Sequence, residues 1–122
     1  MTPQATESPG NSPTRAITIA DYRAEMFEAL TGESVVLSPV MDGPSAATLK
    51  LVEVRRGAVS PYFERQQFSL LFFLKDQPPL ADCLYTIDLP GFAPEGILIS
   101  RVFAPKYSRL DPDAMIYEAV FT

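Results

Sequence analysis

The segment Phe68–Leu74 constrains the fold most, because it is apolar on both faces of an extended strand. Its even-numbered residues share one face, while Leu71 and Phe73 occupy the other. A strand of this kind must be covered on both sides. One cover is the interior of a curled sheet. The second is either the one helix predicted in this chain, which precedes Glu33, or a partner subunit.

From Glu33 onward the apolar residues alternate with period two, which predicts strands rather than helices. The candidate segments are rich in Val, Ile, Phe, Tyr and Thr, and clusters of Pro, Gly and Asp separate them. They cover residues 34–37, 47–55, 63–74, 83–89, 97–104 and 115–121. The connections between them are short, the last being residues 105–114, and favour antiparallel neighbours. We therefore expect a mainly β (α+β) domain, a meander that curls into a small antiparallel barrel or roll of about six strands.

The pattern before Glu33 predicts one short amphipathic helix packed on this barrel. Thr18 is a candidate N-cap with Asp21 in the first turn, and Gly32 is a candidate stop. An apolar face recurs at helical spacing between them, formed by Tyr22, Met26, Phe27 and Leu30.

The remaining N-terminal residues, 1–16, contain three prolines and no large apolar residue after Met1. This composition predicts a disordered tail ahead of a single β-rich domain at residues 17–122. The alternative is an arm that becomes ordered on a neighbouring subunit.

Composition argues against several function classes. The chain has no histidine, no tryptophan and one cysteine, Cys83, so imidazole-based catalysis and zinc sites are disfavoured. A net charge of −5 disfavours nucleic acid as a partner. No apolar run is long enough to span a membrane, and the first residues lack the pattern of a secretory signal. These features predict a cytoplasmic protein without classical export, although it could be incorporated in an extracellular or virion-like assembly.

The polar and reactive side chains form no pattern that predicts a catalytic residue, a cofactor site or a metal site. Asp111 and Asp113 flank Pro112, which favours a turn over calcium binding. Cys83 begins an apolar strand and is interpreted as a buried, inert thiol. Arg101 interrupts an apolar face, which favours an ordinary ion pair over a contact with a partner.

Apolar side chains at the outer face of one strand and along the last strand are the candidate contacts with another protein. A chain that ends in an apolar strand must pair that strand internally or with another chain. The predicted interface residues are Leu71, Phe73, Met115, Tyr117 and Phe121.

An ordered set of short motifs resembles an uncharacterised family of small bacterial proteins, a domain of unknown function with a helix and a β-meander. The motifs lie at residues 30–32, 49–54, 68–72, 85–87, 102–105 and 117–121. The chain departs from the family pattern at Leu89-Pro90, where many members are expected to have His-Pro, and in a long loop at residues 57–64. The resemblance implies no catalytic residues. It implies a setting near genes that resemble those of phage tail collars.

Three classes of function follow. The first is a non-catalytic structural or adaptor subunit that contacts itself or another protein, in a phage-tail-like or fibre assembly. The second is a small-molecule-binding barrel lined by Phe72, Tyr85, Phe103 and Tyr117. The third is an enzyme that uses carboxylates, a tyrosine or a Ser–Lys pair. The first is the main hypothesis.

Overall fold

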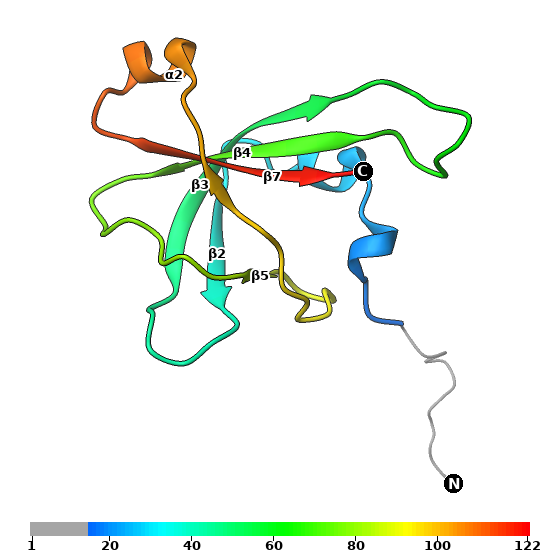
Figure 1. Ribbon diagram of the computed structural model, residues 1–122, viewed down its shortest axis with the longest axis horizontal. Coiled ribbons are helices and arrows are strands. Elements are labelled where there is room, and N and C mark those ends of the chain that lie inside the picture. Colours follow the sequence, from blue (N-terminus) through cyan, green and yellow to red (C-terminus); the bar gives the residue numbers. More distant parts are fainter. Residues whose placement is uncertain (1–14) are drawn as a thin grey trace, which may run out of the picture.

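The computed structural model describes residues 15–122 as a six-stranded curled sheet with two short helices (Figure 1). All neighbouring strands pair antiparallel, in the order β5-β2-β3-β4-β7-β6. The mainly β prediction is confirmed. No helix in residues 15–122 is long and apolar enough to cross a membrane. The strands are β2 (Ser34–Pro39), β3 (Ala47–Arg56), β4 (Phe68–Leu74), β5 (Tyr85–Asp88), β6 (Ser100–Arg101) and β7 (Met115–Phe121).

Only β2, β3 and β4 follow one another as a meander, so the predicted meander is wrong beyond its third strand. The strand after β4 is β5, which pairs with β2 at the far edge of the sheet. The place beside β4 is taken by β7, in register from Phe68↔Phe121 to Leu74↔Met115. An alternating pattern determines which face of a strand is buried and does not identify its neighbour.

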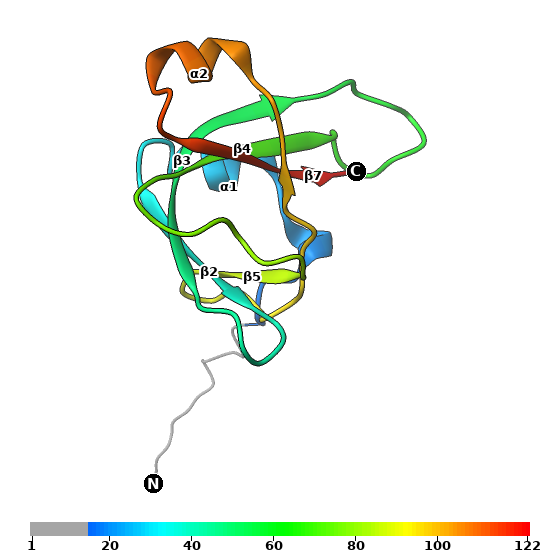
Figure 2. The same cartoon turned by 60° about the vertical axis from the view of Figure 1, so that its left-hand side comes forward.

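The curl of the sheet depends on β3. Its first half pairs with β2, and its second half pairs with β4. The register shifts between Leu51 and Glu53, and an irregularity of this kind bends a strand and increases its twist. As a result, β2 and β5 lie across the interior from β4 and β7 (Figures 1 and 2).

One segment connects the two edges of the sheet. The Ile97 N–H donates to the Tyr85 carbonyl at 2.7 Å and the Tyr85 N–H donates to the Ile97 carbonyl at 3.0 Å, which attaches the segment to β5. Further along, β6 pairs with β7, and the Val102 N–H donates to the Ile116 carbonyl at 2.9 Å. Much of each sheet edge is thereby covered, which reduces the backbone available for unwanted pairing.

The main core fills the inside of the curl, and five aromatic rings meet at one end of it. Tyr22, Phe27 and Phe121 are buried there, with ring centroids 5.4 Å apart for Tyr22–Phe27 and for Tyr22–Phe121. Phe68 and Phe92 complete the group. Such edge and offset contacts add about 0.5–1.5 kcal/mol per pair beyond the burial of apolar area.

The single helix predicted from Thr18 to Gly32 is not formed. A 3₁₀ turn, η1 (Ile19–Asp21), and a short helix, α1 (Ala24–Glu28), take its place. Between them Tyr22 and Arg23 have extended backbones, with ψ of 134° and 150°. This break directs the Tyr22 ring into the core, where the side chain is fully buried. The periodic spacing is present, but the burial of one large ring overrides it.

A second helix covers the outer face of the sheet (Figure 2). This helix is α2 (Pro105–Leu110), which begins with proline in its first turn, a favoured position. Its Tyr107 ring packs edge-on against Phe73 with centroids 5.4 Å apart, and its hydroxyl donates to Glu53 Oε1 at 2.5 Å. A second apolar cluster forms beneath it, containing Leu71, Ala104, Tyr107 and Ile116, with Val52, Phe73 and Val102 packed against them.

Therefore α2 supplies the outer cover that the doubly apolar strand requires. The cover expected from the sequence was the N-terminal helix or a partner subunit. The first expectation is wrong, because α1 packs inside the curl through Ala24 and Phe27. Residues 105–114 were expected to form a plain connection. That interpretation is wrong for Pro105–Leu110.

Removing the side chain of Leu71 tests whether α2 makes this outer face part of the core. We expect Leu71→Ala to lower the free energy of unfolding by about 2–5 kcal/mol, because it leaves a cavity under α2. Leu110→Ala is the matched control on α2, since Leu110 is 73% exposed, and it should change stability by less than about 0.5 kcal/mol. Urea unfolding followed by circular dichroism measures both. Equal effects of the two substitutions would contradict the packing described.

Candidate functional site

The predicted interface residues are used for packing within the chain. Leu71, Tyr117 and Phe121 are at most 4% exposed, and Phe73 and Met115 are partly buried. Leu71 and Phe73 lie under α2, while the other three belong to the main core. These five side chains therefore form no continuous surface in the folded chain.

The lining predicted for a ligand-binding barrel does not converge on a cavity. Phe72, Tyr85 and Tyr117 are buried in the main core, whereas Phe103 is 82% exposed next to α2. The Tyr85 hydroxyl accepts a hydrogen bond from the Ala81 N–H at 2.8 Å, and the Tyr117 hydroxyl accepts one from the Leu80 N–H at 3.1 Å. The hydroxyls of both tyrosines thus hold the loop before β5.

The side chains that the sequence singled out as possible reactive or binding groups do not gather at one site. Asp111 accepts a hydrogen bond from Lys75 Nζ at 2.9 Å, and this contact lowers the pKa of its carboxyl group. Cys83 is partly exposed rather than buried. Arg101 has no salt bridge within residues 15–122, and its guanidinium instead lies 6.0 Å from the centre of the Tyr117 ring. In the same range no three His, Cys, Asp or Glu side chains cluster as metal ligands would.

The loop between β3 and β4 presents the most exposed aromatic side chain of the described residues. It extends well beyond the end of the sheet (Figure 1). Tyr62 is 90% exposed, Val59 is 79% exposed and Phe63 is 51% exposed. We call these three residues the hairpin tip. The sequence analysis assigned Phe63 to a strand beginning there, but β4 starts only at Phe68.

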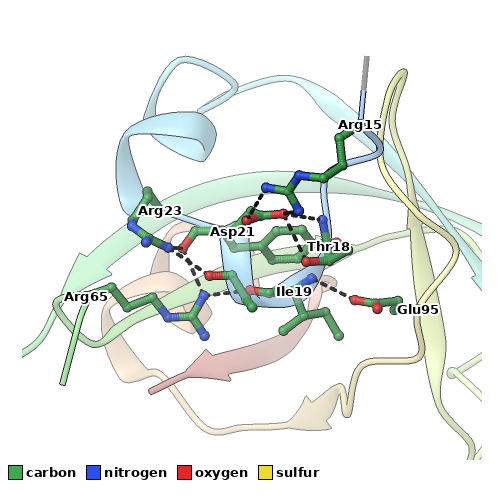
Figure 3. Close-up of polar contacts among 9 residues, drawn as sticks. Arg15, Thr18, Ile19, Asp21, Arg23, Arg65 and Glu95 are labelled. Atoms are coloured by element: carbon green, nitrogen blue, oxygen red, sulfur yellow. Dashed lines mark hydrogen bonds and ion pairs between the residues drawn. The ribbon is translucent and has the colours of Figure 1, made fainter. Parts of the chain in front are cut away.

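The base of the hairpin tip is fixed by Arg65, as Figure 3 shows. Its Nη1 donates to the carbonyls of Ile19 at 2.6 Å and Tyr22 at 2.9 Å, and its Nε donates to the backbone oxygen of Thr122 at 3.0 Å. Its guanidinium also lies 5.7 Å from the centre of the Phe68 ring. Partial burial, followed by the neighbouring Arg23 charge, lowers the pKa of Arg65, which nevertheless stays charged.

The residues before α1 are attached to the same end of the sheet (Figure 3). The Ile19 N–H donates to Glu95 Oε1 at 2.7 Å. Asp21 accepts hydrogen bonds from both Nη atoms of Arg15 at 3.0 Å, and from the N–H and hydroxyl of Thr18. Arg15 belongs to the predicted tail at residues 1–16 and contacts the domain, whereas residues 1–14 lie outside the described part of the chain.

A hollow of about 390 Å³ separates the hairpin tip from this attached segment. Arg23, Arg65 and Glu64 supply charged groups to its wall, and Tyr62 and Phe63 supply aromatic surface. Arg23 Nη1 donates to the carbonyls of Ala20 and Tyr22, both at 3.0 Å. The arrangement offers aromatic faces and guanidinium donors, which are suited to binding carboxylates, carbonyls and apolar side chains. These groups are typical of a recognition surface.

The three hydrogen bonds of Arg65 should make it important for stability. We expect Arg65→Ala to lower the free energy of unfolding by about 2 kcal/mol, because three backbone acceptors lose a charged donor. Arg65→Lys should restore only part of this, since one ammonium lacks the planar fork. Arg55→Ala is the control, because the exposed Arg55 side chain forms a salt bridge with Glu53, at 3.3 Å, and surface pairs contribute little. If Arg55→Ala lowered the free energy of unfolding as much as Arg65→Ala, the anchoring role of Arg65 would be contradicted.

The contacts of Asp21 predict a pH dependence. The Arg15 guanidinium, followed by the two Thr18 donors, holds the pKa of Asp21 well below its usual range. Since the unfolded value is about 4, ionised Asp21 stabilises this segment above that pH, and the contribution disappears as the pH falls toward the folded pKa.

The amide proton of Thr18 donates to Asp21 and should report this titration in NMR spectra. We expect its chemical shift to change only below pH 4, and Asp21→Asn to abolish the change. A titration midpoint near 4 would show that the contact does not hold in solution.

Comparison with known proteins identifies the family and leaves the function open. No curated protein and no solved structure matches the chain. The domain of unknown function DUF6916 matches residues 22–121, which include α1, all six strands and α2. This range also contains the hairpin tip, Arg65 and one of its three backbone acceptors, Tyr22, whereas Ile19 and Thr122 lie just outside it. The chain therefore belongs to the DUF6916 family.

Proposed function

We propose that the protein is a non-catalytic structural or adaptor subunit that acts by contacting itself or another protein through the hairpin tip. The observation that carries this proposal is the 90% exposure of Tyr62 at the end of a loop whose base Arg65 anchors. An exposed aromatic side chain costs solvation free energy that burial in a partner recovers.

The surroundings of the tip support contact with a protein. Tyrosine and arginine are enriched among the residues that dominate binding at protein interfaces. Tyr62 and Phe63 lie beside Arg23 and Arg65 in one hollow. Because the base of the loop is held by hydrogen bonds to Ile19 and Tyr22, less conformational entropy is lost on binding.

The family resemblance supplies the setting that we propose, a phage-tail-like or fibre assembly. Such assemblies are built from many copies of small subunits, so they need exposed contacts on a stable fold.

We propose no catalytic residue and no cofactor, and the partners are protein rather than nucleic acid or membrane. A ligand-binding barrel is not favoured, because the residues expected to line it pack together or lie outside the curl.

Native mass spectrometry of the protein isolated from its own host tests this proposal. We expect a multiple of the 13.4 kDa chain or a stoichiometric complex with a second polypeptide. The double substitution Tyr62→Ala/Phe63→Ala should eliminate that species, whereas Phe103→Ala should preserve it. Phe103 is a matched control, since it is 82% exposed and precedes α2 by two residues, and α2 lies away from the loop between β3 and β4 (Figure 1).

Two results would contradict the proposal. A bare monomer, or a monomer with the added mass of a small molecule, would argue against a subunit role. A complex lost in Phe103→Ala but retained in the double variant would move the contact away from the hairpin tip.

A further inference from the structure

A second hollow lies at the other end of β3. It has a volume of about 180 Å³, and its mostly apolar wall includes three prolines, Pro44, Pro78 and Pro79, together with Ala46, Leu80 and Tyr85. An apolar cavity of about 150 Å³ accommodates one benzene ring, so this hollow has the size of a single aromatic side chain. Proline rings and aromatic rings also pack well against each other, as in the recognition of proline-rich peptides. We call this site the proline hollow.

The wall of the proline hollow is held in place before any partner arrives. Gln77 Oε1 accepts a hydrogen bond from the Thr48 N–H at 3.0 Å, and Gln77 Nε2 donates to the Thr48 carbonyl at 2.7 Å. The Ala81 N–H donates to the buried Tyr85 hydroxyl at 2.8 Å. Both ends of the loop at residues 77–81 are thus attached to the sheet. A preformed site of this kind binds with little ordering cost.

The charges near the two surfaces are opposite on balance. Arg23, Arg65 and Glu64 line the hollow beside the hairpin tip, so its side chains carry two positive charges and one negative charge. Asp76 and Asp82 flank residues 77–81 in sequence, and neither forms a salt bridge within the described residues. Copies of a chain with a net charge of −5 repel one another on average, so association needs opposed local charges of this kind.

One copy cannot bring its own hairpin tip to its own proline hollow. The hollow includes Ala47, the first residue of β3, and the tip follows Arg56, the last. A ten-residue strand spans about 30 Å, so the two surfaces lie at opposite ends of the molecule (Figure 1). They can meet only between two copies. A contact between two different surfaces of the same chain is heterologous, and it generates a ring or an open filament.

We infer that the protein associates head to tail with itself, with the Tyr62 ring at the hairpin tip of one copy seated in the proline hollow of the next and Phe63 beside it. This inference rests on the proposed function and names the partner as a second copy of the chain. The aromatic contact supplies affinity, and Arg23 facing Asp76 and Asp82 supplies orientation. Repetition of the contact builds a linear or cyclic array.

A mixing experiment with two variants tests the head-to-tail geometry. Tyr62→Ala/Phe63→Ala removes the tip and keeps the hollow, while Ala46→Trp fills the hollow from an exposed position and keeps the tip. We expect the wild type to grow in mass with concentration during sedimentation velocity. Each variant alone should stay monomeric, and an equal mixture should form a one-to-one dimer and nothing larger. Circular dichroism confirms that each variant is folded.

Other outcomes overturn the inference. If Ala46→Trp alone still dimerises, the contact is between two tips; if the mixture stays monomeric, the tip does not enter the hollow. A pure wild type that is monomeric up to about 1 mM rules out self-association at any useful affinity. If that monomer still forms a complex with a second polypeptide in its host, the proposed function stands and only the choice of partner is wrong.

A charge reversal keeps the inference testable if Ala46→Trp does not fold. Asp82→Lys reverses the charge of an exposed loop residue. We expect it to raise the dissociation constant of self-association about tenfold, which corresponds to about 1.4 kcal/mol, because an attractive charge pair at the interface is lost. Added salt should weaken the wild type in the same direction. Glu33→Lys, at an exposed position in the turn before β2, is the control and should leave association unchanged. Equal effects of the two reversals would overturn the inference.

Discussion

The structure depends on the burial of β4 on both faces. Its inner face belongs to the core inside the curl, and its outer face lies under α2. Because the strand pairs with β3 on one side and β7 on the other, its backbone is also fully bonded. This double cover places Leu71 and Phe73, which the sequence predicted to contact a partner, under α2. The exposed aromatic residues that remain include the hairpin tip and Phe103, outside the sheet.

The sequence predicted the strands well and their neighbours poorly. Residues 47–55 and Met115–Phe121 carry clear alternation, and the structure has strands there with at most one residue of difference. The place of β5 beside β2 arises from pairing between distant segments, which no local pattern encodes. The N-terminal helix was predicted too long, because the helical spacing of Tyr22 gives no sign that burying its ring requires an extended backbone. Pro105 was a usable signal for α2 that was interpreted as part of a connection.

The candidate site was the least predictable part. Phe63 was assigned to a strand because aromatic residues favour strands, although Pro61 precedes it and the alternation begins only at Phe68. The Arg65 contacts join η1, the hairpin and the residue after β7, and such a convergence appears only once the chain is folded. What the sequence did indicate is the unusual length of this loop. The proposed contact with a partner gives a reason for this length, because the exposed tip adds nothing to the core of its own chain.

The most direct measurement is a dilution series of two-dimensional amide NMR spectra of the wild-type protein. The account predicts concentration-dependent shifts at both ends of β3, at Tyr62 and Phe63 and at residues 77–81, with none at β6. Shifts confined to β6 and to Val120, the exposed part of the opposite sheet edge, would show that a different surface makes the contact. Spectra unchanged by dilution, in a protein that also has no partner in its host, would contradict the central claim that the hairpin tip is a binding surface.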